Sequence, residues 1–321
     1  MVRTPLRVSF LGGGSDYPFY ADNGHIGCVL SGTIDHYVYA LARRRRDGKI
    51  LAHYSGREEV EQIEDLQNEY IRESLLWVGW EGGIEVSSQA DIGANAGLGG
   101  SSAFLVALLR CLKVLQDDPW DDPIALAEEA FRLESGPLGR KVGRQDHYAA
   151  ALGGLREYHF APEGVRVMGE IVAPWFLEDK LLLLRVNGRQ SYGEQILQAL
   201  HDEERNGGVI ELNYDIAHMA FLGAQLAMAG DWHGCLSFVG KSWEIKKRTS
   251  PHVSNPALDA IYDEVIAAGA HGGKICGMGG GGHFLFYCPD GKEKVLQGLG
   301  EKYRDIPFRF ADDGVTVMMK V

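Results

Sequence analysis

Apolar residues recur along this chain at spacings that predict helices. Leu105, Leu108, Leu109, Leu112 and Leu115 return every three or four residues, so they predict a helix with a buried face over 104–115. The same spacing, together with residues that start and stop helices, predicts further helices at 69–77, 123–133, 191–202, 213–229, 256–268 and 292–303.

Strands are predicted where short apolar runs lie between glycine-rich turns. They dominate the first part of the chain and alternate with helices later. The predicted strands are 6–11, 27–30, 37–41, 84–89, 155–160, 180–186, two that flank the glycine cluster 277–282, and one near 316–320. This order predicts an α+β fold in two halves, which meet near residues 161–180.

The length and composition are typical of a globular protein with about two domains. The chain has 321 residues, of which 45% are hydrophobic and 24% charged. It contains no run of about 18 apolar residues that could span a membrane, and its first residues lack the apolar core of a signal peptide. We therefore expect a cytoplasmic protein without a membrane partner.

Charge, cysteines and histidines narrow the possible functions. The net charge of -12 disfavours nucleic-acid binding, which needs a basic surface. The basic run Arg43–Arg46 is interpreted as the solvated end of a hairpin, because Asp47 and Gly48 follow it. The five cysteines are odd in number and scattered, so we expect reduced packing residues and neither disulfides nor a zinc site. The histidines show no metal-binding spacing, and His147 is interpreted as a packing or hydrogen-bonding residue.

The glycine-rich turn at 95–103 carries the clearest chemistry. Glycines let a backbone wrap closely around a phosphate, the following helix favours negative charge, and Ser101 and Ser102 add hydroxyls that can reach a metal ion. An ordinary helix cap would need only one glycine and one serine, so we interpret the turn as an anion site. A Walker A sequence is absent, and the later cluster 277–282 precedes a strand, whereas a dinucleotide-binding motif requires a helix there.

Four charged residues near the glycines are candidates for catalysis or binding. Arg7 stands at the start of a predicted strand and Asp16 just beyond its glycine-rich end, where they could meet phosphate charge and sugar hydroxyls. Asp16 is equally consistent with a turn residue. Glu134 and Asp146 lie further along the chain, and each by itself is also consistent with a solvated surface acid.

Three segments together are similar to the three motifs of the GHMP kinases, the superfamily named for galactokinase and the homoserine, mevalonate and phosphomevalonate kinases. These segments are 5–8, 97–103 and 274–282, and their order and spacing agree with the family over the whole chain. Within the family, the chain resembles sugar 1-kinases that act on D-glycero-D-manno-heptose 7-phosphate. The segments that carry this closer resemblance are 3–16, 145–154, 241–248 and 254–256. Two positions depart from the family pattern, Gly100 in place of a frequent serine and Met278 in place of a common alanine.

The resemblance implies a two-domain fold. Residues 1–170 would form a ribosomal-protein-S5-like domain that binds ATP and Mg²⁺ and contains a left-handed β-α-β crossover, against the usual right-handed rule. Residues 171–321 would form a ferredoxin-like α/β sandwich, in which helices cover an antiparallel sheet.

The resemblance also implies a role for each motif. The ATP phosphates would be bound by Gly97, Leu98, Gly99, Gly100, Ser101, Ser102 and Ala103. Mg²⁺ would be held by Ser101 or Ser102 together with Glu134. Asp146 would contact the attacking hydroxyl, with Arg7 beside it. The substrate would meet Asp16, Gly13, Gly14, Gly279, Gly280, Gly281 and Arg189, and the further candidates for a substrate phosphate are Lys246, Lys247 and Arg248.

These roles imply an ATP-dependent kinase that phosphorylates the anomeric hydroxyl of a sugar phosphate, converting the heptose 7-phosphate to the 1,7-bisphosphate. Phosphoryl transfer mainly needs positioning and neutralisation of charge, which backbone amides, Mg²⁺ and one arginine supply. Two alternatives stay open: a kinase for another sugar, such as fucose or an octose phosphate, and a non-catalytic regulator that binds a sugar or a nucleotide. The presence of Glu134, Asp146 and both serines argues against the regulator. An oligomer is also left open.

Overall fold

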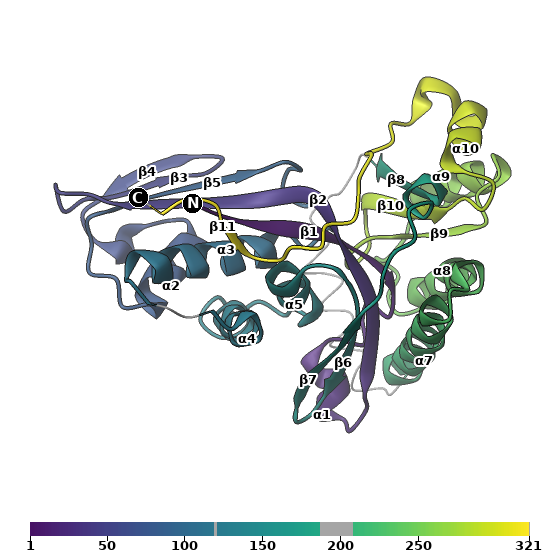
Figure 1. Cartoon of the computed structure of the whole chain (residues 1–321), viewed down its shortest axis with the longest axis horizontal. Coiled ribbons are helices and arrows are strands. Elements are labelled where there is room, and N and C mark those ends of the chain that lie inside the picture. The colour runs from purple at the N-terminus through teal and green to yellow at the C-terminus, as the bar shows by residue number, and fades with distance from the viewer. Residues whose placement is uncertain (119–120, 187–207, 321) are drawn as a thin grey trace.

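The computed structural model describes residues 1–118, 121–186 and 208–320, and their strands form two sheets (Figure 1). In the larger sheet the strand order is β11-β1-β2-β5-β3-β4, with β6 and β7 joined to it through β2. The smaller sheet is antiparallel, in the order β8-β10-β9. The strands are β1 Val2–Leu11, β2 Gly27–Arg44, β3 Ile50–His53, β4 Arg57–Val60, β5 Ile84–Ala90, β6 Leu155–Ala161, β7 Gly164–Glu170, β8 Leu181–Val186, β9 Gly272–Ile275, β10 Gly282–Tyr287 and β11 Thr316–Val317.

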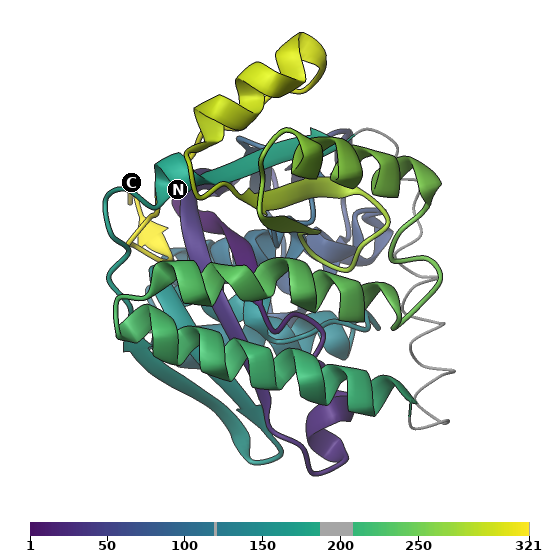
Figure 2. The ribbon, with the colours of Figure 1, turned by 90° about the vertical axis from the view of Figure 1, so that its right-hand side faces the viewer.

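The helices divide between the two sheets. Helices α2 to α5 lie on one face of the larger sheet (Figure 1), and α7 and α8 lie side by side, with α9 beside the smaller sheet (Figure 2). The α-helices are α1 Pro18–Asp22, α2 Glu69–Trp77, α3 Gly100–Leu115, α4 Pro123–Ser135, α5 Gln145–Leu152, α7 Gly208–Met228, α8 Trp232–Lys247, α9 Pro256–Ala267 and α10 Lys292–Leu299. The predicted α+β fold is confirmed. The expected β-α-β crossover corresponds to β3, α2 and β5, because β3 and β5 pair in parallel.

The strand β2 is longer than the sequence predicted. Two separate strands were expected at 27–30 and 37–41, but β2 runs without a break from Gly27 to Arg44 and pairs with β1 along most of that length. Gly32 lies in the middle of this strand and forms no turn. Its missing side chain instead makes room for Leu155 and Phe310, whose atoms would lie 2.9 Å from a Cβ there. The glycine therefore serves packing and not a turn.

The helix α3 begins earlier than expected and is buried on more than one side. It starts at Gly100, so the last residues of the glycine-rich turn form its first turn. Its apolar residues contribute to two core clusters, with Leu105 and Leu109 in the cluster toward α4 and α5, and Leu108 and Leu112 in the cluster with α2 and β5. The apolar face that the sequence predicted is thus only part of the buried surface of α3, which packs in the core on two sides.

Several predicted helices agree closely with the structure, and others were missed. The helix α2 has the predicted bounds, and α10 ends at Leu299 because Gly300, with φ of +63°, turns the chain. The short strands β3, β4 and β7 and the helices α1, α5 and α8 were not predicted. The helix predicted at 191–202 lies outside the described residues.

The arginine run does not form the predicted hairpin. Strand β5 lies between β2 and β3, so the connection at 45–49 crosses from one neighbour of β5 to the other. The backbone amide of Arg45 donates to the carbonyl oxygen of Gly83, and the amide of Gly83 donates to the carbonyl oxygen of Gly48. The residues just before β5 therefore bond to both ends of this connection. A hairpin is excluded because a third strand occupies the central position.

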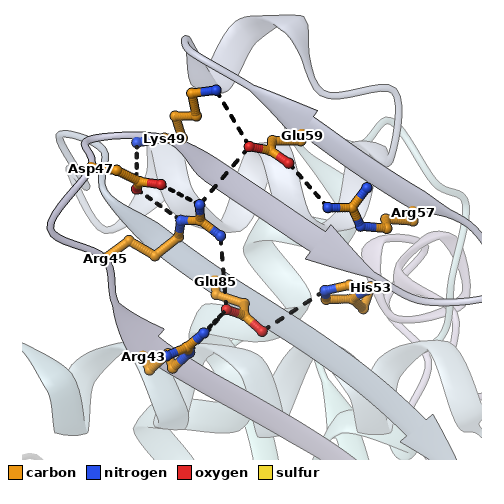
Figure 3. Close-up of polar contacts among 8 residues, drawn as sticks. All are labelled: Arg43, Arg45, Asp47, Lys49, His53, Arg57, Glu59 and Glu85. Carbon is orange, nitrogen blue, oxygen red and sulfur yellow. Dashed lines mark hydrogen bonds and ion pairs between the residues drawn. The ribbon is translucent and has the colours of Figure 1, made fainter.

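Two arginines of this run, Arg43 and Arg45, lie in a network of ion pairs at this end of the sheet (Figure 3), whereas Arg44 and Arg46 are exposed outside it. Arg45 is the centre, since it pairs with Asp47 and lies 3.9 Å from both Glu59 and Glu85. Arg43 also pairs with Glu85, and its side chain is 73% exposed. Exposed pairs of this kind contribute about 0–1 kcal/mol each. The network therefore organises the sheet end without being a major source of stability.

The end of the chain returns to the larger sheet and connects the two sheets. Asp305 bridges to β8, Phe310 then bridges to β2, and β11 pairs with β1 beside the N-terminus. Both termini consequently lie together, with the amino group of Met1 donating to the carbonyl oxygen of Met319 at 2.8 Å (Figure 1). We refer to residues 305–317 as the C-terminal strap.

All five cysteines are buried free thiols, as predicted. Among the helices of the described part of the chain, none combines the length and the hydropathy that crossing a membrane requires.

Candidate active site

A pocket of about 840 Å³ lies where β1, the glycine-rich turn, α5 and the last residues of α8 meet. All three sequence motifs contribute to its lining. Most of the residues that the sequence proposed for the site also line it: Arg7, Gly13, Gly14, Asp16, Gly97, Gly99, Gly100, Ser101, Ser102, Glu134, Asp146 and Lys246.

Arg7 and Asp146 form a two-pronged ion pair at the centre of this pocket. Arg7 Nε donates to Asp146 Oδ1 at 2.7 Å, and Arg7 Nη2 donates to Oδ2 at 2.8 Å. The third guanidinium nitrogen donates to the carbonyl oxygen of Gly97 at 2.7 Å. Burial lowers the pKa of Arg7, but the adjacent Asp146 carboxylate more than offsets this and raises it overall. The pair therefore holds a fixed positive and negative charge against the glycine-rich turn.

The glycine-rich turn presents the N-terminus of α3 to the pocket. Gly97 and Gly99 have left-handed φ angles of +77° and +78°, and no side chain caps the helix. The first amides of a helix have no partner within it, so those of α3 are available to an anion. Leu98 and Ala103 are buried in the core instead of lining the pocket, and they anchor the turn.

Glu134 is fully buried and receives three hydrogen bonds. Ser102 Oγ and Tyr70 Oη donate to its two oxygens at 2.8 and 3.0 Å, and His147 Nε2 lies 2.7 Å from Oε2. Burial by itself raises the pKa of Glu134, but the contacts with His147, Ser102 and Tyr70 outweigh it and the pKa is lowered. Ser101, by contrast, is exposed. The prediction that His147 is a hydrogen-bonding residue agrees with this arrangement.

Asp16 also lines the pocket and is 2% exposed. The backbone amide of Gly14 donates to Oδ1 at 3.0 Å, and that of Gln145 approaches Oδ2 at 3.4 Å. Burial is the largest influence on this carboxyl and raises its pKa, despite the hydrogen bond from Gly14. Gly143 allows the close approach, because a Cβ there would lie 1.9 Å from Oδ2. Asp16 is a positioned buried carboxyl and more than a turn residue.

The glycine cluster 277–282 packs against the glycine-rich turn at 95–103. A Cβ on Gly277 would lie 2.9 Å from Gly97 Cα, and one on Gly282 would lie 2.6 Å from the carbonyl oxygen of Ala96. Gly277 and Met278 line the pocket. The residues predicted to bind substrate, Gly279, Gly280 and Gly281, are buried outside this lining, and their role stays a prediction.

The cations proposed for a substrate phosphate separate into different environments. Lys246 is buried and lines the pocket, whereas Lys247 pairs with Glu244 at 2.9 Å and Arg248 is exposed at the end of α8. Arg189 lies outside the described residues.

Several other lining residues were not given a role from the sequence, among them Ser9, Tyr70, Gln145 and Lys274. Lys274 had a usable signal, because a lysine beside buried apolar residues in a strand needs a reason to be there.

A separate group of possible metal ligands lies outside the pocket lining. Cys28, Glu157 and His159 offer ligand atoms within 4.8 Å of one another. Glu157 Oε1 lies 2.7 Å from His159 Nε2 and 3.4 Å from Cys28 Sγ, so the carboxylate already has two partners.

Family models match two parts of the chain. The model for the GHMP kinases N terminal domain matches residues 63–154, and the model for the GHMP kinases C terminal region matches residues 225–305.

The chain is similar to known kinases over nearly its full length. It is 27% identical to D-glycero-alpha-D-manno-heptose 7-phosphate kinase of Campylobacter jejuni, over 98% of this chain and 97% of that protein. It is 25% identical to D-glycero-D-manno-heptose 1-phosphate kinase of Bacteroides thetaiotaomicron, with a TM-score of 0.77 over 98% of each chain. Mevalonate kinase of Methanococcus jannaschii shares the fold, with a TM-score of 0.70 and 17% identity over 97% of this chain and 98% of that one. The motif order, the fold and both family models agree that the chain belongs to the GHMP kinases, ATP-dependent phosphotransferases whose acceptor is an alcohol group.

Proposed function

We propose that this kinase phosphorylates the anomeric hydroxyl of a sugar phosphate, and specifically converts D-glycero-D-manno-heptose 7-phosphate to the 1,7-bisphosphate. The support for the acceptor comes from two relatives whose names contain a heptose phosphate. Those names differ in the carbon that carries the phosphate. An anomeric hydroxyl loses its proton more easily than an ordinary alcohol, which favours it as the group that attacks ATP.

We place the ATP phosphates at the glycine-rich turn and the start of α3. Mg²⁺ prefers oxygen ligands, and Ser102 Oγ and the Glu134 carboxylate are oxygen donors 2.8 Å apart in the pocket lining, so the donor set fits this ion. When bound, Mg²⁺ supplies neutralisation of the charge on the phosphates. Of the two serines, Ser102 is proposed as the ligand, because it is the one in contact with Glu134.

We place the acceptor between Asp16 and Asp146. Asp16 accepts hydrogen bonds from sugar hydroxyls, and Asp146 accepts the proton of the attacking hydroxyl. As that oxygen bonds to the γ-phosphorus, the bond between phosphorus and the leaving oxygen of ADP breaks. Arg7 keeps Asp146 oriented through both carboxylate oxygens and adds positive charge beside the transferred group.

The observation that carries this proposal is the contact between the ion pair and the turn. A Cβ on Gly99 would lie 3.4 Å from both Arg7 Cγ and Asp146 Cγ. The proposed proton acceptor is therefore adjacent to the helix N-terminus that would hold the phosphates, as in-line transfer between bound ATP and a hydroxyl requires.

The test is an acceptor screen with purified protein, ATP and Mg²⁺. We expect ADP release with the heptose 7-phosphate, and ³¹P NMR should show a new phosphate at the anomeric carbon. Asp146→Asn should lower kcat by at least about 100-fold while ATP binding is kept. Asp263→Asn, at an exposed position of α9, is the control. If the protein releases no ADP with any sugar or sugar phosphate, the proposal fails.

A further inference from the structure

Two buried lysines lie at the acceptor end of the pocket. Lys246, in the last turn of α8, is 8% exposed, and Lys274, in β9, is 2% exposed. Both line the pocket. Lys246 Nζ donates to the carbonyl oxygen of Gly277 at 2.5 Å. Within the described residues, the ammonium of Lys274 has no hydrogen bond and no ion pair.

Further unpaired polar atoms lie around Gly13, next to Lys246. A Cβ built on Gly13 would lie 3.4 Å from Ser9 Oγ, 3.6 Å from Gln145 Nε2 and 3.9 Å from Lys246 Nζ. The buried atoms Ser9 Oγ and Gln145 Oε1 have no hydrogen-bond partner in the described structure. We refer to Ser9, Gly13, Gln145 and Lys246 as the cradle. Buried polar groups are normally hydrogen-bonded, so the unpaired atoms of the cradle indicate a ligand that supplies the missing partners.

The charges at this end of the pocket do not balance. Arg7 and Asp146 neutralise each other, which leaves Lys246 and Lys274 with Asp16 as the nearest acid. Burial lowers the pKa of Lys246 to about 8. Burial and the nearby Lys246 lower the pKa of Lys274 to about 7. An anion that entered the cradle would pair the excess positive charge and favour both ammonium forms.

The cradle is displaced from the ATP side along β1. The start of α3 contacts the earlier part of the strand, where Thr4 donates to the carbonyl oxygen of Ala103 and Arg7 donates to that of Gly97. Ser9 and Gly13 lie in the opposite direction, and Ser9 is about 7 Å beyond Arg7 at the usual rise of a strand. A ligand held by Ser9 and Gly13 would thus lie further along β1 than the start of α3, where we place the ATP phosphates.

We propose that Lys246 and Ser9, which lie around Gly13, form with the nearby Lys274 a subsite for an acidic group that the acceptor already carries. This inference rests on the proposed function, in which the acceptor is a sugar phosphate. The phosphate would occupy the cradle while the hydroxyl at the other end of the sugar faces Asp146. The two lysines would then select phosphorylated over neutral sugars, since a neutral group would leave a buried cation unpaired.

Steady-state kinetics with the full chain test this subsite. Lys274→Met and Lys246→Met remove the charge but keep an apolar chain of similar length. Gly13→Ala fills the cradle at ordinary contact distances and at a backbone conformation that alanine tolerates. Each change should raise KM for the heptose 7-phosphate about tenfold or more and leave KM for ATP within about twofold. With unphosphorylated heptose as acceptor, kcat/KM should fall by a much smaller factor than with the heptose 7-phosphate, because the neutral sugar has no acidic group to bind there. Lys241→Met, an exposed lysine of the same helix, is the matched control.

A binding measurement separates this inference from the proposed function. Inorganic phosphate is titrated against the protein with a non-hydrolysable ATP analogue present, so that the nucleotide site is filled. The wild type should bind phosphate, and Lys274→Met and Gly13→Ala should lose that binding. If the wild type binds phosphate in this way but never phosphorylates the heptose 7-phosphate, the proposed function fails and the subsite stands. If the wild type binds no phosphate, or the variants lower kcat/KM equally for phosphorylated and neutral heptose, the subsite is overturned.

Discussion

At the scale of single residues, the two serines at the start of α3 lie in different surroundings. Ser102 is buried against Glu134, and Ser101 is exposed. We predict that Ser102→Ala raises the Mg²⁺ concentration for half-maximal activity by about 10- to 100-fold, because it removes the proposed metal donor and the partner of Glu134. Ser101→Ala should change it less than about threefold. The measurement is initial rate against free Mg²⁺ at saturating ATP, and the reverse order would assign the metal to Ser101.

The buried carboxyl of Asp16 gives a prediction for stability and pH. Burial raises its pKa above the usual value of 3.8, so ionised Asp16 costs folding free energy. This cost is absent below pH 3.8 and grows as the pH rises through the folded-state pKa. Asp16→Asn should therefore raise Tm at pH 7, and the gain should shrink as the pH is lowered toward 4. The same variant should raise KM for the acceptor about tenfold or more, since it alters the group that we propose faces the sugar.

Thermal melts of Asp16→Asn and wild type over pH 4 to 8 measure this difference. Asp263→Asn, an exposed aspartate, should leave Tm unchanged across the range. A lower Tm for Asp16→Asn at every pH would show that the carboxylate stabilises the fold, contrary to the prediction.

Residue types and their spacing indicated which residues line the pocket better than which residues they contact. Arg7 and Asp146 were both proposed from motifs, but their contact depends on the meeting of β1 and α5, 139 positions apart in sequence. The pairing of Ser102 with Glu134 likewise depends on how α3 packs against α4. The sequence left the choice between the two serines open for this reason, because tertiary packing decides which hydroxyl faces inward.

At the scale of elements, the apolar pattern contains the signal for helices such as α2 and α8, and it fails where packing overrides local signals. Helix α2 has its predicted bounds. Helix α8 was missed although Trp232, Cys235, Leu236, Val239 and Trp243 follow helical spacing and are all buried. The unbroken course of β2 could not be predicted, because it depends on pairing with β1 and on ring packing over a glycine.

The contact between the glycine-rich turn at 95–103 and the glycine cluster 277–282 yields a prediction at the scale of elements. Gly97 has φ of +77°, and a Cβ there would lie 2.4 Å from the carbonyl oxygen of Cys276. Gly97→Ala must therefore separate the two loops and shift the start of α3. We expect ATP binding to weaken at least about tenfold, because the amides of the turn lose their alignment with the phosphates.

Isothermal titration with a non-hydrolysable ATP analogue measures this effect. Gly230→Ala is the matched control, because Gly230 also has a left-handed φ, of +85°, but a Cβ there would meet nothing within 4 Å. The control carries the backbone strain of about 1–2 kcal/mol without the collision. Equal ATP affinities for the two variants would mean that strain alone, and not the contact between loops, explains any loss.

At the scale of the whole molecule, the two predicted halves share one core. The largest core cluster joins residues of the larger sheet to apolar residues of α7, α8, β8 and β10. The strap at 305–317 makes a second connection, because Ile306 bonds to Leu183 of the smaller sheet and Ala311 bonds to Thr33 of the larger one. The division at residue 170 stays a prediction, and the last strand of the second half lies in the sheet of the first.

This shared core predicts that both sheets unfold together. Phe310 in the strap packs on Phe10, Phe308 and the space over Gly32, so Phe310→Ala should cost about 2–3 kcal/mol. Urea unfolding followed by hydrogen exchange and mass spectrometry should show the loss of protection in β5 and in β10 at the same lowered urea concentration. Val172→Ala, at a side chain that is 86% exposed, should leave both midpoints unchanged. If Phe310→Ala destabilises β5 alone while β10 keeps the wild-type midpoint, the two halves are independent folding units, because a shared core cannot lose stability on one side only.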